Sequence, residues 1–138
     1  MDKEEGFCTF KGYDFKGEDG MTVAQEDYLE MIFRNAGEDG SVRLGVLARQ
    51  INVSVPSASR MVHSMSADGF VTFEKYGLIY LTEKGRETGA YLLRRHEIID
   101  SFLSRINGTE NETRQTELIE HFLDKRTVEN ISVFLSRF

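Results

Sequence analysis

The segment 44–81 restricts the fold of this chain more than any other. Apolar residues recur at helical spacing on both sides of the tight connection Asn52-Val53-Ser54, which predicts two helices, the second reaching about Ala67. Two β-rich apolar runs follow at 70–73 and 78–81, and the short loop between them predicts a hairpin. A hairpin directly after a helix-turn-helix forms a wing, so this segment predicts a winged helix-turn-helix.

The second helix of this motif has recognisable ends. Ser54 is expected to be its N-cap, Pro56 suits its first turn because no intrahelical donor is lost there, and Gly69 supplies a stop. The helix would turn an apolar stripe toward the core, and this stripe comprises Ala58, Met61 or Val62, and Met65.

Helical patterns continue on both sides of the winged segment. Thr22 and Gln25 form a capping-box pattern before a helix that reaches about Gly37. Thr82 can cap a long helix that runs to about residue 105 or 106.

Two shorter helices are predicted at about 112–123 and 127–138. The single proline and the long periodic stretches favour a mostly α protein. We therefore predict a winged helix-turn-helix domain over residues 21–82 and an all-helical domain over 83–138. Residues 1–20 lack helical periodicity and form an arm without an assigned role.

The charge is distributed unevenly along the chain. The formal net charge of −6, taken alone, argues against nucleic-acid binding. Residues 40–67, however, contain no acidic residue, and they carry Arg43, Arg49, Arg60 and His63. A locally basic helix-turn-helix inside an acidic chain predicts contact with double-stranded DNA.

The outward face of the second helix would make the contacts to bases. We expect Ser57 and Arg60 near base edges, and Arg43, Arg49 and Lys75 near phosphates. An ordinary solvated helix face is the alternative. The full set of predicted DNA-contacting residues is Arg43, Arg49, Ser54, Ser57, Ser59, Arg60, His63, Ser64 and Lys75.

The chain shows no pattern typical of a secreted or membrane protein. Cys8 is the only cysteine, which argues against a disulfide framework and favours a reducing compartment. The first residues lack a signal-peptide pattern, and no run approaches the ~18 apolar residues of a membrane span. We expect a cytoplasmic protein without a membrane partner.

Metal-binding residue types cluster near the end of the chain. Glu117, Glu120 and His121 stand at i, i+3 and i+4 within the predicted helix 112–123, so their side chains would share one face. Two carboxylates at this spacing repel each other, and a divalent cation would turn that cost into an advantage. A solvated acidic face is the alternative.

Two further segments carry ligand types. Asp27 and Glu30 repeat the paired-carboxylate spacing in the first predicted helix, and His96 lies in the long one. Singly, Asp27 could merely favour the helix dipole, and His96 could be a structural histidine. Such an oxygen-rich set with a minority of imidazoles suits manganese and ferrous iron, although zinc or cobalt would bind at least as tightly.

Several motifs, in their order and spacing, belong to one known pattern. They are Glu26-Asp27-Tyr28-Leu29-Glu30, Tyr76 with Leu81-Thr82-Glu83-Lys84-Gly85, Arg95-His96-Glu97, and Ile119-Glu120-His121. Over roughly residues 22–138 the chain resembles the diphtheria-toxin-repressor family of metal-dependent transcription regulators, and within it the manganese-type members. Iron-type members place methionine and cysteine where Asp27 and Glu117 stand.

This resemblance implies a winged-helix DNA-binding domain and a helical dimerisation domain, with a metal site where they meet. It implies two Mn²⁺ ions per subunit, for which Fe²⁺, Co²⁺, Cd²⁺ or Zn²⁺ can substitute. Asp100, one turn after His96, would orient that imidazole without ligating the metal. The implied ligands are Asp27, Glu30, His96, Glu117, Glu120 and His121.

The function implied by the resemblance is that of a homodimeric repressor of metal-uptake genes, which binds a palindromic operator when it holds manganese. It implies neither an enzyme nor a small-molecule substrate. One alternative is a winged-helix regulator that responds to an organic ligand or a protein partner. Another is a small metallohydrolase, since the segment His96-Glu97-Ile98-Ile99-Asp100 resembles the helix motif of zinc proteases with aspartate in place of the second histidine.

Overall fold

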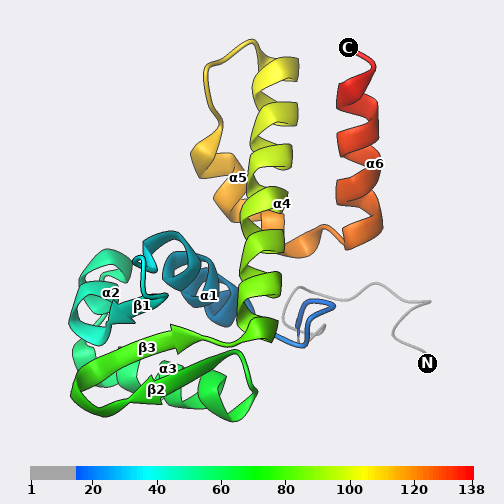
Figure 1. The fold of residues 1–138 in the computed structure, drawn as a ribbon. Helices are drawn as coiled ribbons and strands as arrows, with labels where there is room; N and C mark the ends of the chain where they lie inside the picture. Colours follow the sequence, from blue (N-terminus) through cyan, green and yellow to red (C-terminus); the bar gives the residue numbers. More distant parts are fainter. Residues whose placement is uncertain (1–14) are drawn as a thin grey trace, which may run out of the picture.

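The computed structural model of this chain describes residues 15–138. Residues 1–14, which include Cys8 and most of the predicted arm, lie outside the described residues. Figure 1 shows a winged-helix part and a helical part, with one long helix, α4 (Glu83–Asn107), running through both. The prediction of a mostly α fold with a winged helix-turn-helix is confirmed.

The winged-helix part begins with the predicted capping box. The Thr22 hydroxyl accepts the Gln25 N–H, and the Gln25 side chain accepts the Thr22 N–H in return. Ser54 caps the second helix of the motif by accepting the Ser57 N–H. The elements of this part are α1 (Val23–Asn35), β1 (Ser41–Arg43), α2 (Leu44–Ile51), α3 (Val55–Ala67), β2 (Val71–Glu74), the 3-10 turn η2 (Lys75–Gly77) and β3 (Leu78–Leu81).

The wing is the hairpin of an antiparallel sheet with the strand order β1-β3-β2. The prediction lacked β1, because three residues are too few to show an alternating pattern. Ser41 is paired with Tyr80 and Arg43 with Leu78. Through β1 the sheet holds the start of α2 against the wing.

The core of the winged-helix part lies between α1, the helix-turn-helix and the sheet. Ala58, Val62 and Met65 of α3 are fully buried, as the apolar stripe predicted. Leu29 and Ile32 of α1 belong to the same core cluster. Because α3 commits this stripe to the core, its opposite face remains outward.

The helical part departs from the prediction at one place. After α4 come α5 (Thr113–Ile119), the 3-10 turn η3 (Glu120–Phe122) and α6 (Lys125–Ser136). The prediction of one helix over 112–123 is therefore wrong at its end. Glu120 and His121 are only 2% and 5% exposed, so the tighter turn directs them into the interior, where buried contacts outweigh continuation of the helix.

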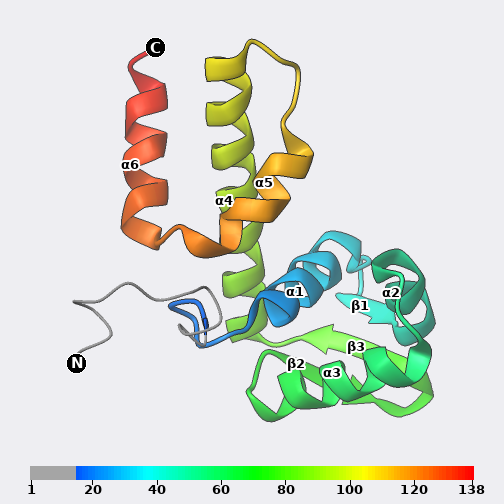
Figure 2. The same cartoon turned by 180° about the vertical axis from the view of Figure 1, so that it is seen from behind.

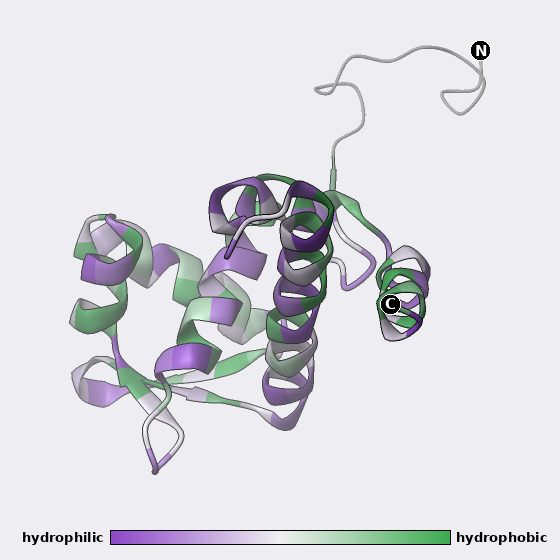
Figure 3. Ribbon diagram, turned by 90° about the horizontal axis from the view of Figure 1, so that it is seen from above, coloured by the Kyte–Doolittle hydropathy of each residue, from purple (hydrophilic) through white to green (hydrophobic). Residues whose placement is uncertain are grey.

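Helix α6 packs along the outer half of α4, as Figures 1 and 2 both show. It begins two residues earlier than predicted, because Asp124 caps it by accepting the Thr127 N–H. Val133, Phe134 and Phe138 stay exposed, and Figure 3 colours much of this end as hydrophobic.

Within the described part of the chain, no helix has both the length and the apolar character needed to cross a membrane.

Gly85 marks a close approach between α4 and the winged-helix part. A Cβ at this position would lie 1.9 Å from the carbonyl oxygen of Phe70. We predict that Gly85→Ala lowers the free energy of unfolding by about 1–3 kcal/mol, because the backbone must shift. Gly45→Ala in α2 is the control, since nothing lies within 4 Å of the added Cβ. Urea denaturation measures both variants, and equal stabilities would contradict this close packing.

Candidate metal centre

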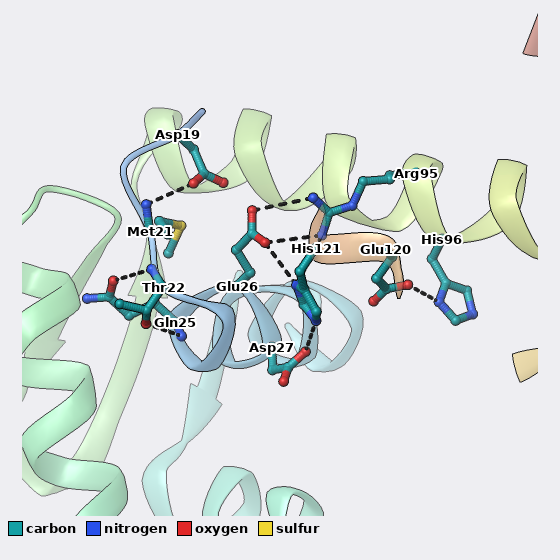
Figure 4. Close-up of polar contacts among 10 residues, drawn as sticks. All are labelled: Asp19, Met21, Thr22, Gln25, Glu26, Asp27, Arg95, His96, Glu120 and His121. Atoms are coloured by element: carbon teal, nitrogen blue, oxygen red, sulfur yellow. Dashed lines mark hydrogen bonds and ion pairs between the residues drawn. The ribbon is translucent and has the colours of Figure 1, made fainter. Parts of the chain in front are cut away.

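The candidate ligands come together where three elements meet. Asp27 and Glu30 project from α1, His96 projects from α4, and Glu120 and His121 are in η3. Figure 4 shows Asp27, Glu120 and His121 between α1 and α4, with His96 beside Glu120. The site thus joins the winged-helix part to the helical part.

One group of potential ligands comprises Asp27, Glu120 and His121. Each offers a ligand atom within 4.8 Å of the others. The Nε2 atom of His121 lies 2.9 Å from Asp27 Oδ1. The Asp27 side chain is 55% exposed, whereas His121 is buried, so this group opens to solvent on the Asp27 side.

A second group comprises Glu30, His96 and Glu120, again with ligand atoms within 4.8 Å of one another. His96 Nδ1 lies 2.7 Å from Glu120 Oε2. Glu30 is paired with Arg34 at 2.5 Å. Glu120 belongs to both groups, so one carboxylate links two potential cation positions.

The pKa shifts show how these groups are balanced without a cation. The hydrogen bond to Glu120 raises the pKa of His96. Burial alone would lower the pKa of His121, but its hydrogen bonds to Asp27 and Glu26 raise it to about 9. Burial and the negative charge of Glu120 raise the pKa of Glu30. Protons thus offset carboxylate charge here, as a bound cation would.

Glu117 and Asp100 lie outside these groups. Glu117 is exposed on α5, and neither group includes it. Asp100 accepts the backbone N–H of Glu112 at the start of α5. Ligation by Glu117 and orientation of His96 by Asp100 remain predictions from the sequence.

The sequence prediction assigned no role to a buried network beside the site. Glu26 is 2% exposed and contacts Arg95 Nη2 at 3.3 Å and His121 Nδ1 at 2.9 Å. Hydrogen bonds with His121 and Asp19 and the positive charge of Arg95 outweigh burial and lower the pKa of Glu26. A signal was available, because Glu26 lies three residues before buried Leu29, on the apolar stripe of α1.

Asp19 extends this network into the segment before α1. Burial and its hydrogen bond with Glu26 raise the pKa of Asp19 to about 7. Below that pH its carboxyl keeps a proton that it donates to Glu26. Figure 4 shows Asp19 next to Glu26, on the side away from Asp27.

The predicted DNA-contacting residues are all exposed or half-buried. Ser57 and Arg60 adjoin on α3, where Arg60 Nη2 donates to Ser57 Oγ at 3.2 Å. The His63 ring packs on Phe73 of the wing with centroids 4.9 Å apart, and Ser64 contacts Gln25 of α1. Arg43 ends β1, Arg49 lies on α2, and Lys75 lies in η2. Their contact with DNA remains a prediction.

Family comparison gives both parts an identity. Residues 21–78 match the model "Iron dependent repressor, N-terminal DNA binding domain", and residues 82–138 match "Iron dependent repressor, metal binding and dimerisation domain". The regulator named "HTH-type transcriptional regulator MntR" from Geobacillus kaustophilus (strain HTA426) is 35% identical over 118 residues, 85% of this chain and 84% of the relative. The chain belongs to the diphtheria-toxin-repressor family.

Two further members of the diphtheria-toxin-repressor family are also similar to this chain. The regulator of the same name from Bacillus subtilis (strain 168) is 34% identical over 85% of this chain and 83% of its own length. The solved structure titled "Structure of the manganese regulator SloR" is 29% identical with a TM-score of 0.71, over 84% of this chain. The chain spans about half of that structure, 55% of its length. This diphtheria-toxin-repressor family member is a metal-dependent, DNA-binding transcription regulator.

We predict that the pH dependence of stability without metal depends on His121. Because folding raises its pKa from 6.5 to about 9, its stabilising contribution is complete below pH 6.5 and is lost as the pH rises through about 9. The loss should reach at most about 3 kcal/mol. Urea denaturation in the presence of a chelator, across this range, measures it.

The control is His121→Gln, which cannot titrate. Its stability should fall less over the same pH range than that of the wild type. Parallel pH profiles for the two proteins would rule out His121 as the group responsible.

Proposed function

We propose that this chain is a manganese-responsive repressor of metal-uptake genes, which binds a palindromic operator as a homodimer. The observation that carries the proposal is the convergence of Asp27 and Glu30 from the winged-helix part with His96, Glu120 and His121 from the helical part. These side chains belong to matched DNA-binding and metal-binding domains. A regulator of chromosomal genes would act in the cytoplasm.

The donor chemistry fits manganese. The five gathered residues offer three carboxylates and two imidazoles, and hard oxygen donors with few nitrogens suit Mn²⁺. Two groups that share Glu120 fit a pair of ions per subunit. Glu117 is proposed as the sixth ligand on the sequence pattern alone. Fe²⁺, Co²⁺, Cd²⁺ or Zn²⁺ could occupy the same donors.

The proposed mechanism is linkage between the two domains. Asp27 and Glu30 move with α1, whereas His96, Glu120 and His121 move with the helical part. Bound cations would supply positive charge that neutralises the facing carboxylates. The residues could then hold α1 in one placement relative to the dimer axis. The cations would raise DNA affinity only to the extent that they bind more tightly to the arrangement that is competent to bind DNA.

The dimer would form through the exposed apolar surface of the helical part. Ile106, Val133, Phe134 and Phe138 are exposed here on α4 and near the end of the chain. A hollow of about 490 Å³ lined by Phe102, Ile131 and Phe134, among others, adjoins them. A symmetric dimer would present two α3 helices to two half-sites, which is why we propose a palindromic operator.

We predict that Glu120→Gln reduces manganese-activated operator binding at least tenfold, roughly the loss expected when a ligand shell is disturbed. The reason is that Glu120 serves both candidate cation positions. The effect is measured by gel shifts in the presence of Mn²⁺ or of a chelator. The DNA duplexes used are those selected beforehand for binding to the wild-type protein. Glu117→Gln is tested in parallel as the sixth proposed ligand.

Glu110→Gln is the control, since Glu110 is an exposed acid in the loop between α4 and α5. It should behave as the wild type. If Mn²⁺ changes neither the melting temperature nor the DNA affinity of the wild type, this result would instead favour a regulator that responds to an organic ligand or a protein.

We also predict that Arg60→Ala weakens operator binding by about 1–3 kcal/mol and leaves Mn²⁺ affinity unchanged, because Arg60 faces outward on α3. Fluorescence anisotropy measures DNA binding, and calorimetry measures the metal. Arg114→Ala, a matched loss of an exposed arginine on α5, is the control. Equal DNA affinities for the two variants would remove Arg60 from the interface.

A further inference from the structure

Residues 15–21, which are the described part of the arm together with Met21, contact both domains, and we call this segment the clasp. The Gly17 N–H donates to the Met21 carbonyl at 2.9 Å, and Gly20, with φ +80°, lies within the turn between them. The clasp leads directly into α1, so one of its ends is covalently part of the winged-helix part.

Two clasp residues reach the helical part. Glu18 Oε1 accepts the backbone N–H of Lys125, the first residue of α6, at 2.6 Å. The Phe15 ring packs edge-on against Phe122 in η3 with centroids 5.0 Å apart. The clasp therefore bridges the same two domains as the candidate ligands, by contacts that need no cation.

A third clasp side chain, Asp19, joins the network around the candidate site. Its Oδ1 accepts the Met21 N–H at 2.8 Å, which fixes the carboxyl, and it is hydrogen-bonded to Glu26. A Cβ on Gly17 would lie 3.0 Å from Asp19 Oδ1 and 3.1 Å from Glu26 Oε2. The clasp backbone thus covers both carboxyl groups closely.

Glu26 carries this contact to the candidate ligand His121. It lies 2.9 Å from His121 Nδ1, while His121 Nε2 faces Asp27. A histidine that ligates through one nitrogen is oriented by the partner of the other. Glu26 is therefore placed to orient His121, and Asp19 is placed to hold Glu26.

Removal of the Asp19 side chain would expose Glu26. The clasp forms one wall of a cavity of about 500 Å³ that Glu26, Arg95 and His121 also line. Without Asp19, water in this cavity could compete for the Glu26 oxygens. The match to the DNA-binding family model begins at residue 21, so the contacts of Phe15, Glu18 and Asp19 are additions to the matched domains.

We propose that the clasp is a metal-independent joint between the two domains and that Asp19 is a positioning residue, which orients His121 for metal through Glu26. This inference rests on the proposed function, because His121 needs this orientation as a metal ligand.

The test compares Asp19→Ala with Asp19→Asn in the full chain. Asparagine can still donate to Glu26 and accept from Met21, whereas alanine can do neither. We expect Asp19→Ala to weaken Mn²⁺ binding by calorimetry about tenfold, in the range for loss of a residue that supports a ligand. Its Co²⁺ absorption spectrum, which reports ligand geometry, should also change. Asp19→Asn should retain the wild-type Mn²⁺ affinity and Co²⁺ spectrum. Glu110→Ala is the control for the loss of an acidic side chain.

Two results would overturn the role of Asp19. One is a Mn²⁺ affinity and Co²⁺ spectrum in Asp19→Ala equal to those of Glu110→Ala. The other is an equal loss in Asp19→Ala and Asp19→Asn with an equal drop in melting temperature, which would make Asp19 purely structural.

His121→Ala separates this inference from the proposed function. If the wild type binds Mn²⁺, His121→Ala loses this binding and Asp19→Ala retains it, the role of the clasp alone would be rejected. Wild-type binding no tighter than that of His121→Ala would reject the metal centre and the clasp role together.

Discussion

The arrangement of the two domains depends on acidic side chains that are buried where they meet. Glu26 and Glu120 are each only 2% exposed, and a buried carboxylate must be paired or neutralised. Glu26 is paired with Arg95 of α4 and His121 of η3, and Glu120 is paired with His96 of α4. These pairs join Glu26 of α1 to residues of the helical part. The same contacts therefore balance the charge of Glu26 and fix the placement of α1 relative to the helical part. A divalent cation would enter a site where this balance already exists.

Local signals predicted most of the fold. The caps at Thr22, Ser54 and Thr82 depend on neighbouring residues, so the sequence alone predicted the helix starts that they mark. Strand β1 and the early end of α5 depend on partners far along the chain. The pairing of Ser41 with Tyr80 and the burial of Glu120 beside His96 cannot be read from three or four residues.

The candidate site shows the same division. The ligand types and spacing identified the five residues that converge, but their identities could not show that Glu117 would be exposed once α5 ended at Ile119. The network of Glu26 and Arg95 left a weaker signal, a charged residue on each apolar stripe. Nothing in the composition of the arm indicated that Asp19 would reach Glu26, since that contact requires the folded joint.

Helix α1 gives the site a short physical route to the DNA-binding surface. Its second turn carries Asp27 and Glu30, while Gln25 in its first turn donates to Ser64 of α3 at 3.4 Å. Its buried face, including Leu29, packs in the same core as α3. A close-packed core transmits displacement rather than absorbing it. Any change in the placement of α1 relative to α4 must therefore reposition α3 relative to the helical part, which is the geometry that the proposed dimer would present to DNA.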